Sequence, residues 1–131
     1  MDYNKTFESF NTGKLVYQGK EISLDALTWN NHPTFEGVSL KHIVTSKESN
    51  GLFSYHLVSI APNCKIGKHI HELQLETHEV ISGSGYAVTK QDSVINYAVG
   101  VLAIFDKKVP HEVIAGDNGL CLFAKFMPAL V

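Results

Sequence analysis

Short segments of alternating apolar and polar residues run along most of the chain, and Gly, Asn, Asp or Pro separates each segment from the next. Alternation with a period of two predicts β-strands, and even spacing of short strands is typical of an all-β sandwich or barrel. Between Gly13 and Trp29 no segment is long enough to predict a helix. The predicted strands are 14–17, 21–24, 26–29, 37–45, 52–60, 76–82, 86–89, 94–97, 101–105, 111–114 and 120–127.

Turn-forming residues mark the expected connections between these strands. Glycine clusters predict turns at 83–85 and 116–119, and polar residues predict another at 46–51. Residues 30–33 form a further turn, because Asn tolerates unusual backbone angles and the residue before Pro avoids the α region. We therefore expect His32 to face solvent.

Length and composition indicate one domain. The chain has 131 residues, of which 44% are hydrophobic and 18% are charged, which suits a single compact core. Residues 1–12 are polar with scattered aromatics and no sustained period, so we expect a loosely ordered N-terminal arm before one domain at 13–131. The net charge of -2 gives no electrostatic reason to expect nucleic acid or an anionic membrane as a partner.

The N-terminal sequence and the cysteines bear on the compartment. Residues 1–6 lack the pattern of a secretory signal, and no apolar run approaches membrane-spanning length, so we expect a cytoplasmic protein. Cys64 and Cys121 are too few to indicate a disulfide scaffold. Cys64 lies five residues before His69 and could be a soft metal ligand, although an unpaired thiol is the more ordinary role.

Candidate chemistry gathers near the middle of the chain. His69 and His71 are alternate residues, which share one face of a strand, and Glu76 follows five positions later. His111 begins a second apolar segment and offers a fourth ligand. Three imidazoles and a carboxylate suit Fe(II), Mn(II), Ni(II), Co(II), Cu(II) or Zn(II), and ligand type alone does not choose among these metals.

This stretch resembles the first signature motif of the cupins, a family of small β-barrels. The motif reads Pro-Gly, five residues, His-x-His, three or four residues, Glu, six residues and Gly. The matching residues here are Pro62, Asn63, His69, His71, Glu76 and Gly83. Only Asn63 differs, and Asn accepts the positive φ that Gly would supply in the turn.

The second cupin motif is matched less fully. It reads Gly, five residues, Pro-x-Gly, two residues, His, three residues and Asn. Gly100 and His111 are in register, but Asp106, Lys108 and Ala115 replace the usual Pro, Gly and Asn. These departures keep the ligand spacing and leave the conformation of the loop before His111 open.

The resemblance implies a jelly-roll barrel, or double-stranded β-helix, with one divalent transition metal per chain on His69, His71, Glu76 and His111. Four protein ligands leave positions for water or a bidentate substrate. Cupins include dioxygenases, isomerases, decarboxylases and lyases as well as binders, so the fold does not fix the function. We expect an enzyme of dioxygenase, isomerase or lyase type acting on a small oxygenated metabolite. The alternative is a non-catalytic protein that binds or senses a sugar or metabolite.

Other polar residues are candidates for contact with a substrate. On the strands before the motif these are Lys41, His42, Tyr55 and His56. The alternative for His42 and His56 is a core or edge histidine that is satisfied by a hydrogen bond. His78 shares a face with Glu76 and lies about 7 Å further along the strand. It is either a catalytic general acid or base, or a buried histidine that hydrogen-bonds a ligand or a backbone group.

The N-terminal segments carry more apolar surface than a minimal barrel needs. The residues concerned are Leu15, Val16, Ile22, Leu24, Leu27 and Trp29. Because cupins commonly pair, we expect a homodimer in which these residues pack at the interface. The alternative is that these strands thicken one sheet of a monomer.

Overall fold

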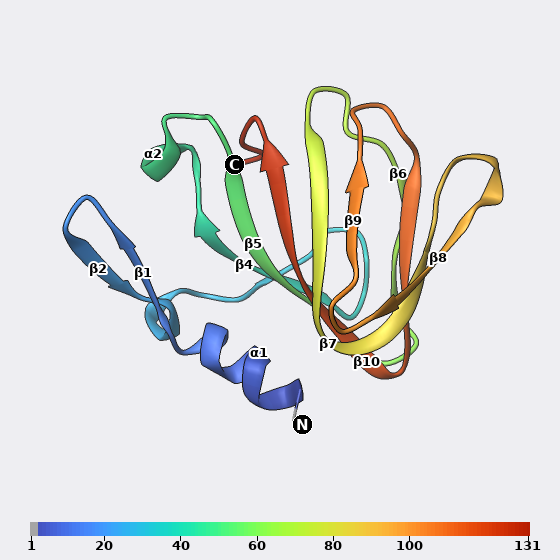
Figure 1. Cartoon of the computed structure of the whole chain (residues 1–131), viewed down its shortest axis with the longest axis horizontal. Helices are drawn as coiled ribbons and strands as arrows, with labels where there is room; N and C mark the ends of the chain where they lie inside the picture. Colours follow the sequence, from blue (N-terminus) through green and yellow to red (C-terminus); the bar gives the residue numbers. More distant parts are fainter. Residues whose placement is uncertain (1–2) are drawn as a thin grey trace.

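The computed structural model describes residues 3–131, which form antiparallel β-structure with short helical elements (Figure 1). The strands are β1 (Lys14–Tyr17), β2 (Lys20–Ser23), β3 (Asn30–Asn31), β4 (Val38–Val44), β5 (Ser54–Ile60), β6 (Lys65–His69), β7 (Leu75–Val88), β8 (Val94–Ala98), β9 (Leu102–Phe105) and β10 (His111–Met127). The helical elements are α1 (Tyr3–Asn11), η1 (Leu24–Ala26), α2 (Ser46–Ser49) and η2 (Lys90–Asp92).

Two long strands, β7 and β10, hold the barrel together. They pair with each other along most of their length. The first part of β10 also pairs with β6 and its last part with β5, whereas β7 pairs with β9 through 76–79 and with β8 through 84–88. Each long strand therefore joins both layers of the barrel. This is the all-β jelly roll, or double-stranded β-helix, that the sequence predicts, and it confirms the fold class.

The turns predicted at 83–85 and 116–119 are wrong, because both segments lie inside the long strands. Gly83 has a positive φ of 76°, and a Cβ at this position would collide with the carbonyl oxygen of Gly119. A Cβ on Gly85 would likewise collide with the backbone of β10. These glycines allow β7 and β10 to bend and approach closely where their register shifts, so the chain does not reverse there.

The segment at 1–12, which we expect to be a loosely ordered arm, instead contains helix α1. Phe7 and Phe10 lie three residues apart, so they share a face of the helix. Phe7 packs on Trp29 with ring centroids 6.1 Å apart, and Phe10 meets the edge of Phe123 at 4.7 Å. Two aromatics in a short helix give little periodic signal, and packing on the sheet stabilises a helix that its own sequence would not.

The connection between β2 and β4 differs from the prediction as well. Residues 26–29 do not form a strand, and the expected turn at 30–33 contains the short strand β3, which pairs with β4. Asn30 helps to hold it there, because its side-chain amide donates to the carbonyl oxygen of Leu40 at 3.3 Å. The polar turn at 46–51 includes the single helical turn α2, which a capping box opens.

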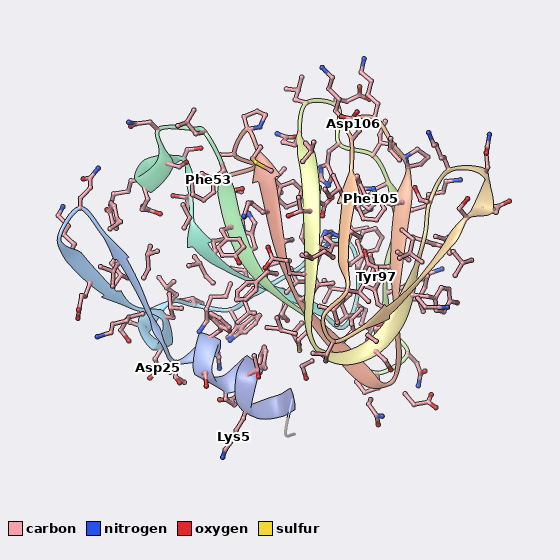
Figure 2. All side chains as sticks on the ribbon, viewed as in Figure 1. Lys5, Asp25, Phe53, Tyr97, Phe105 and Asp106 are labelled. Carbon is pink, nitrogen blue, oxygen red and sulfur yellow. The ribbon has the colours of Figure 1, made fainter. Side chains whose placement is uncertain are left out.

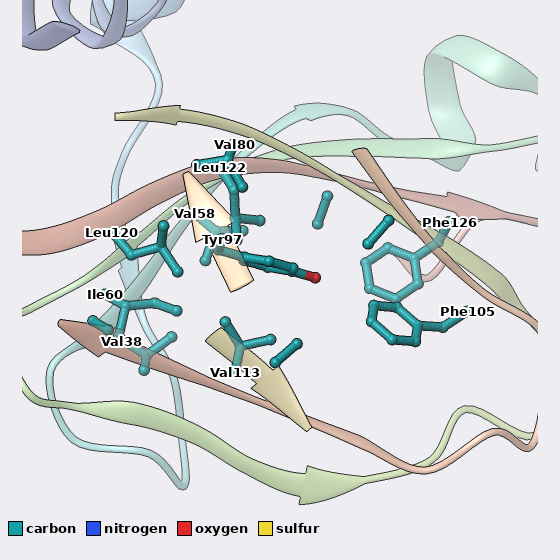
Figure 3. Close-up of a cluster of buried hydrophobic side chains, with 14 residues drawn as sticks. Val38, Val58, Ile60, Val80, Tyr97, Phe105, Val113, Leu120, Leu122 and Phe126 are labelled. Carbon is teal, nitrogen blue, oxygen red and sulfur yellow. The ribbon is translucent and has the colours of Figure 1, made fainter. Parts of the chain in front are cut away.

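Apolar side chains form two clusters on opposite faces of the β5–β10 layer, because neighbouring residues of a strand point to opposite faces. Val58 and Leu122 belong to the cluster that fills the barrel (Figure 3), and Leu57 and Phe123 belong to the cluster covered by the N-terminal segments. Figure 2 shows Tyr97 among the side chains inside the barrel. Within residues 3–131 no helix is both long enough and apolar enough to cross a membrane.

Candidate metal centre

Four side chains from separate elements meet near one end of the barrel interior. His69 ends β6, His71 lies two residues later in the following loop, Glu76 lies near the start of β7, and His111 begins β10. One ligand atom from each lies within 4.8 Å of the others. His69 and His111 are register partners in neighbouring strands, so the sheet itself places two of the imidazoles side by side. This group could hold a metal ion.

The spacing of the donor atoms fits a first coordination shell. Glu76 Oε1 lies 2.8 Å from His111 Nε2 and 3.4 Å from His71 Nε2. Two ligands bound at about 2.1 Å and at right angles would lie about 3.0 Å apart. The donors are therefore already near the separations that a bound cation requires.

Backbone carbonyls fix the orientation of two of the imidazoles. His69 Nδ1 donates to the carbonyl oxygen of Gly67 at 2.7 Å, and His111 Nδ1 donates to that of Val109 at 3.0 Å. A proton on Nδ1 leaves the lone pair of each ring on Nε2, the atom that faces the cluster in His111. Metal-binding histidines in proteins commonly carry this kind of supporting hydrogen bond.

The two replaced glycines of the signature motifs keep the backbone conformation of glycine. Asn63 has φ 61° and Lys108 has φ 65°. The backbone N–H of Lys108 donates to the carbonyl oxygen of His71 at 2.7 Å, which ties the loop before His111 to the loop that carries another ligand. The departures from the second motif therefore leave the ligand geometry in place.

His78 contacts the carboxylate of Glu76. Its Nε2 lies 2.7 Å from Glu76 Oε2, and its Nδ1 lies 2.8 Å from the hydroxyl of Tyr97. All three side chains are buried. With the tyrosine donating to Nδ1 and Nε2–H donating to the carboxylate, His78 holds one oxygen of Glu76 and leaves Oε1 for the cluster. This contact fits the second alternative for His78, a buried histidine that hydrogen-bonds a ligand or a backbone group, and the group it meets is the candidate ligand Glu76.

Glu76 dominates the electrostatics of the site. Burial would raise its pKa, but attraction to His78 and hydrogen bonds from His111 and His78 outweigh burial and hold the pKa far below its ordinary value. Burial would lower the pKa of His111, yet Glu76 outweighs this effect and raises it. Burial lowers the pKa values of His69 and His71. At neutral pH the carboxylate is ionised, and a metal ion would compete with a proton for His111.

Aromatic rings support the imidazoles from the barrel interior. Phe105 stacks on His111 with ring centroids 4.3 Å apart and 12° between the planes, and Phe126 meets His71 edge-on at 4.9 Å. Figure 3 shows the hydroxyl of Tyr97 directed toward the side of the core where Phe105 and Phe126 lie. The close packing restricts the ligand rings to few orientations.

A cavity of about 350 Å³ opens beside three of the four ligands. Its polar end holds His69, His71, Glu76 and His78, and two further polar residues belong to the segment before β4. The rest of the lining is apolar. The complete lining is His32, Thr34, Phe35, Leu40, Val58, Ile66, His69, Ile70, His71, Glu76, His78, Leu122, Ala124, Phe126 and Leu130.

Lys41 and Tyr55 lie on the face of the sheet away from the cavity and outside its lining. Substrate contact by either residue stays a prediction, and this geometry does not support it. The Lys41 ammonium donates to Asn11 Oδ1 at 2.7 Å, to the Asn11 carbonyl at 3.0 Å and to the Leu24 carbonyl at 2.8 Å. The Tyr55 ring stacks on Phe123 at 4.8 Å, and burial together with Glu79 raises the pKa of its hydroxyl to about 12.

His42 and His56 also lie outside the cavity lining, although they share the inner face of the sheet with Leu40 and Val58. Their Nδ1 atoms lie 2.8 Å apart, and His56 Nε2 lies 2.8 Å from the Ser54 hydroxyl. Both ring nitrogens of His56 are therefore occupied. The hydrogen-bonded core histidine considered as the alternative describes this pair.

Sequence reasoning missed the residues that close the cavity. His32 was expected in solvent but is partly buried in the lining, and its Nδ1 accepts hydrogen bonds from the backbone N–H groups of Thr34 and Phe35. A His-Pro turn carries no signal for such a role.

Cys64, the possible soft ligand, packs instead against the barrel core and is outside the ligand group.

Comparison with solved structures shows which class of protein this architecture defines. The polyketide cyclase RemF from Streptomyces resistomycificus matches with a TM-score of 0.71 and 18% identity over 83% of this chain and 78% of its own. An RmlC-like cupin from Shewanella frigidimarina gives 0.70 and 13% over 81% and 87%. A predicted oxalate decarboxylase from Thermotoga maritima gives 0.70 and 17% over 79% and 95%.

These likenesses establish the cupin fold, and the protein is a small cupin-fold barrel with a candidate metal centre. No known protein-family profile and no curated protein matches the sequence. The resemblance read from the two motifs is therefore supported by architecture, at levels of identity that speak for the fold alone.

Proposed function

We propose that the protein is a metal-dependent enzyme acting on a small oxygenated metabolite, by chemistry of the dioxygenase, isomerase or lyase type. One observation carries the proposal: the donor atoms of His69, His71, Glu76 and His111 converge within 4.8 Å beside a cavity of about 350 Å³. A purely structural cation needs no such cavity, because structural sites are closed by protein ligands.

The proposed cofactor is one divalent transition metal ion per chain. When bound, such an ion polarises an oxygen atom of a substrate as a Lewis acid. The residues of the chain would have three tasks. Glu76 supplies the negative charge, Phe105 and Phe126 fix the imidazoles, and the apolar wall excludes water from the reacting end of the cavity.

His78 is a positioning residue in this proposal. Both of its ring nitrogens are engaged, one by Tyr97 and one by Glu76. It holds the carboxylate in the orientation that presents Oε1 to the other ligands. A role as general acid or base is the competing proposal, and it requires the ring to exchange one of these contacts for a substrate atom.

The second candidate is a binding or sensing protein that uses the same cavity without turnover. Structural neighbours named as enzymes, among them a polyketide cyclase and an ectoine synthase, favour the enzyme. The neighbour named only as an RmlC-like cupin leaves the binder open. We further propose a cytoplasmic location, supported by two cysteines that form no disulfide.

The experiment that separates the two functions is a turnover screen. Protein loaded separately with Fe(II), Mn(II), Ni(II), Co(II), Cu(II) or Zn(II) is incubated with pooled oxygenated metabolites, with and without oxygen, and substrate loss is followed by mass spectrometry. Catalytic loss of a compound in excess over protein supports the enzyme. Loss that stops at one equivalent per chain, in every pool and with every metal, contradicts it and supports the binder.

A further inference from the structure

Among the described residues, no lysine lines the cavity beside the metal centre. All eleven basic residues of the chain are lysines, because the sequence contains no arginine. The one buried lysine of the described structure, Lys41, is bonded to Asn11 and Leu24 on the far face of the sheet. The cavity therefore lacks an arginine guanidinium, the planar group that binds a carboxylate or phosphate through two parallel hydrogen bonds.

His32, the histidine that the segment before β4 contributes to the lining, does not replace that cation. His32 accepts two backbone hydrogen bonds on Nδ1, at 3.0 and 3.2 Å, and an imidazole can accept there only while it is neutral. Burial also lowers its pKa. Imidazoles that ligate a metal are neutral as well. His78 is neutral as well when the Tyr97 hydroxyl donates to its Nδ1. Among the described lining residues the bound ion would then supply the positive charge, and Glu76 offsets part of it.

Apolar side chains form the walls around this polar end. Leu40 and Val58 are cross-strand partners on β4 and β5, and Leu122 and Ala124 belong to β10. Phe35 reaches over from the loop before β4. A Cβ on Gly67 would lie 2.7 Å from its ring, so the glycine makes room for the phenyl group against β6. An anionic group next to these walls would lose hydration without gaining a partner.

We propose, building on the metal centre of the proposed function, that the cavity takes a ligand with an uncharged, largely apolar body, such as one ring, and a chelating pair of oxygen atoms at one end. The volume of the cavity lies near the lower limit of the roughly 300–1,000 Å³ that is typical of small-molecule sites. Small di-acids and phosphorylated acids are disfavoured, because each carries a second anionic group that this cavity leaves unpaired. Sugar acids are disfavoured because the apolar walls leave the hydroxyl groups of their body without partners.

Lys108 is the lysine that could challenge this assignment. Its backbone contacts the His71 loop, but its side chain is exposed and outside the cavity lining. An ammonium group in solvent contributes little to binding an anion. The substitution Lys108→Gln is therefore expected to leave the ligand preference unchanged.

Three hydroxamates test the assignment, because they share one chelating group and differ only in the body. The protein is loaded with Zn(II), its metal content is measured, and acetohydroxamate, benzohydroxamate and 4-carboxybenzohydroxamate are titrated by calorimetry at pH 7.5. Burying the phenyl ring should make benzohydroxamate bind about tenfold or more tightly than acetohydroxamate. The added carboxylate should remove most of that gain. Equal binding of the first two, or tightest binding of the carboxylated compound, overturns the inference.

Paired variants separate cavity effects from general charge effects. Leu130 lies at the cavity rim and is 38% exposed, whereas Leu73 is 72% exposed and outside the lining. Leu130→Lys should strengthen binding of 4-carboxybenzohydroxamate at least severalfold, and Leu73→Lys should not. The same gain in both variants contradicts the assigned cavity. If the zinc-loaded protein binds none of the three compounds, the open coordination positions are absent and the proposed function falls together with this inference.

Discussion

At the scale of single residues, the ligands of the site could be predicted and their supports could not. Two simple features bring the four ligands together: the alternation of side chains along a strand and the pairing of β6 with β10. Strand alternation can be read from the positions of His69, His71, Glu76 and His111 in the sequence. The carbonyl groups that orient the imidazoles belong to Gly67 and Val109. Every residue has a backbone carbonyl, so the sequence does not indicate which ones take this role. The 2.7 Å contact between His78 and Glu76 was compatible with strand alternation, but alternation alone did not specify it.

The contact between His78 and Glu76 leads to a prediction about metal affinity. His78→Ala removes the donor that holds Glu76 Oε2, so metal affinity should fall by about 10- to 100-fold. His78→Gln keeps an N–H donor and should recover part of this loss. Chelator competition measures the affinities. If His78→Gln keeps full affinity and loses at least tenfold in turnover on a substrate found by the screen, the catalytic role is the correct one.

The second prediction concerns acid. Metal ligation needs neutral imidazoles. Because Glu76 raises the pKa of His111, protons compete for this ligand at a higher pH than they would for an isolated imidazole. Metal affinity should therefore decrease as the pH falls. Occupancy after equilibrium dialysis should decline below a pH of about 6.5. Full occupancy roughly two pH units lower would count against ligation by histidine.

At the scale of elements, the number of strands was easier to predict than where they end. Gly83 and Gly119 look like turn residues, but in β7 and β10 they permit close approach of two backbones that keep pairing. Whether a glycine reverses the chain or bends a strand is decided by a partner far away in the sequence. Helix α1 shows the same limit, since Phe7 and Phe10 gain their apolar partners only in the folded chain.

The buried Lys41 gives a prediction at this scale. Its ammonium uses all three donors on the end of α1 and on the carbonyl of Leu24. Lys41→Met should lower the free energy of unfolding by about 2–4 kcal/mol, because the buried carbonyl of Leu24 and the partly buried carbonyl of Asn11 lose a charged donor. Metal content should not change. Urea unfolding and elemental analysis together check this, with exposed Lys47→Met as a control. If Lys41→Met loses metal without losing stability, this structural role is wrong and Lys41 contributes to the metal centre.

At the scale of the whole molecule, the homodimer stays a prediction, but its expected surface changes. Leu24 is buried and Leu15 and Trp29 pack within the chain, so the N-terminal segments cover their own sheet. Leu102 and Ile104 of β9 are 70% and 71% exposed, and within residues 3–131 β9 pairs only with β7. Such an edge is a common place for chains to associate.

Light scattering tests this expectation. The chain should behave as a dimer at micromolar concentration, and the double substitution Leu102→Glu, Ile104→Glu should yield a particle of 14.5 kDa. Val16→Glu, on the exposed side of the β1–β2 hairpin, is the matched control and should leave the dimer intact. A particle of monomer mass for the unaltered chain refutes the dimer.

The central claim is that four side chains hold one metal ion beside a small-molecule cavity, and metal content tests it most directly. Protein purified without an affinity tag should carry close to one equivalent of a divalent transition metal per chain, measured by elemental analysis. His69→Ala with His111→Ala should carry almost none, while His42→Ala, which alters a histidine outside the cluster, should keep its metal. Metal near zero in the unaltered protein even after reconstitution, or unchanged metal in the double variant, would contradict the account.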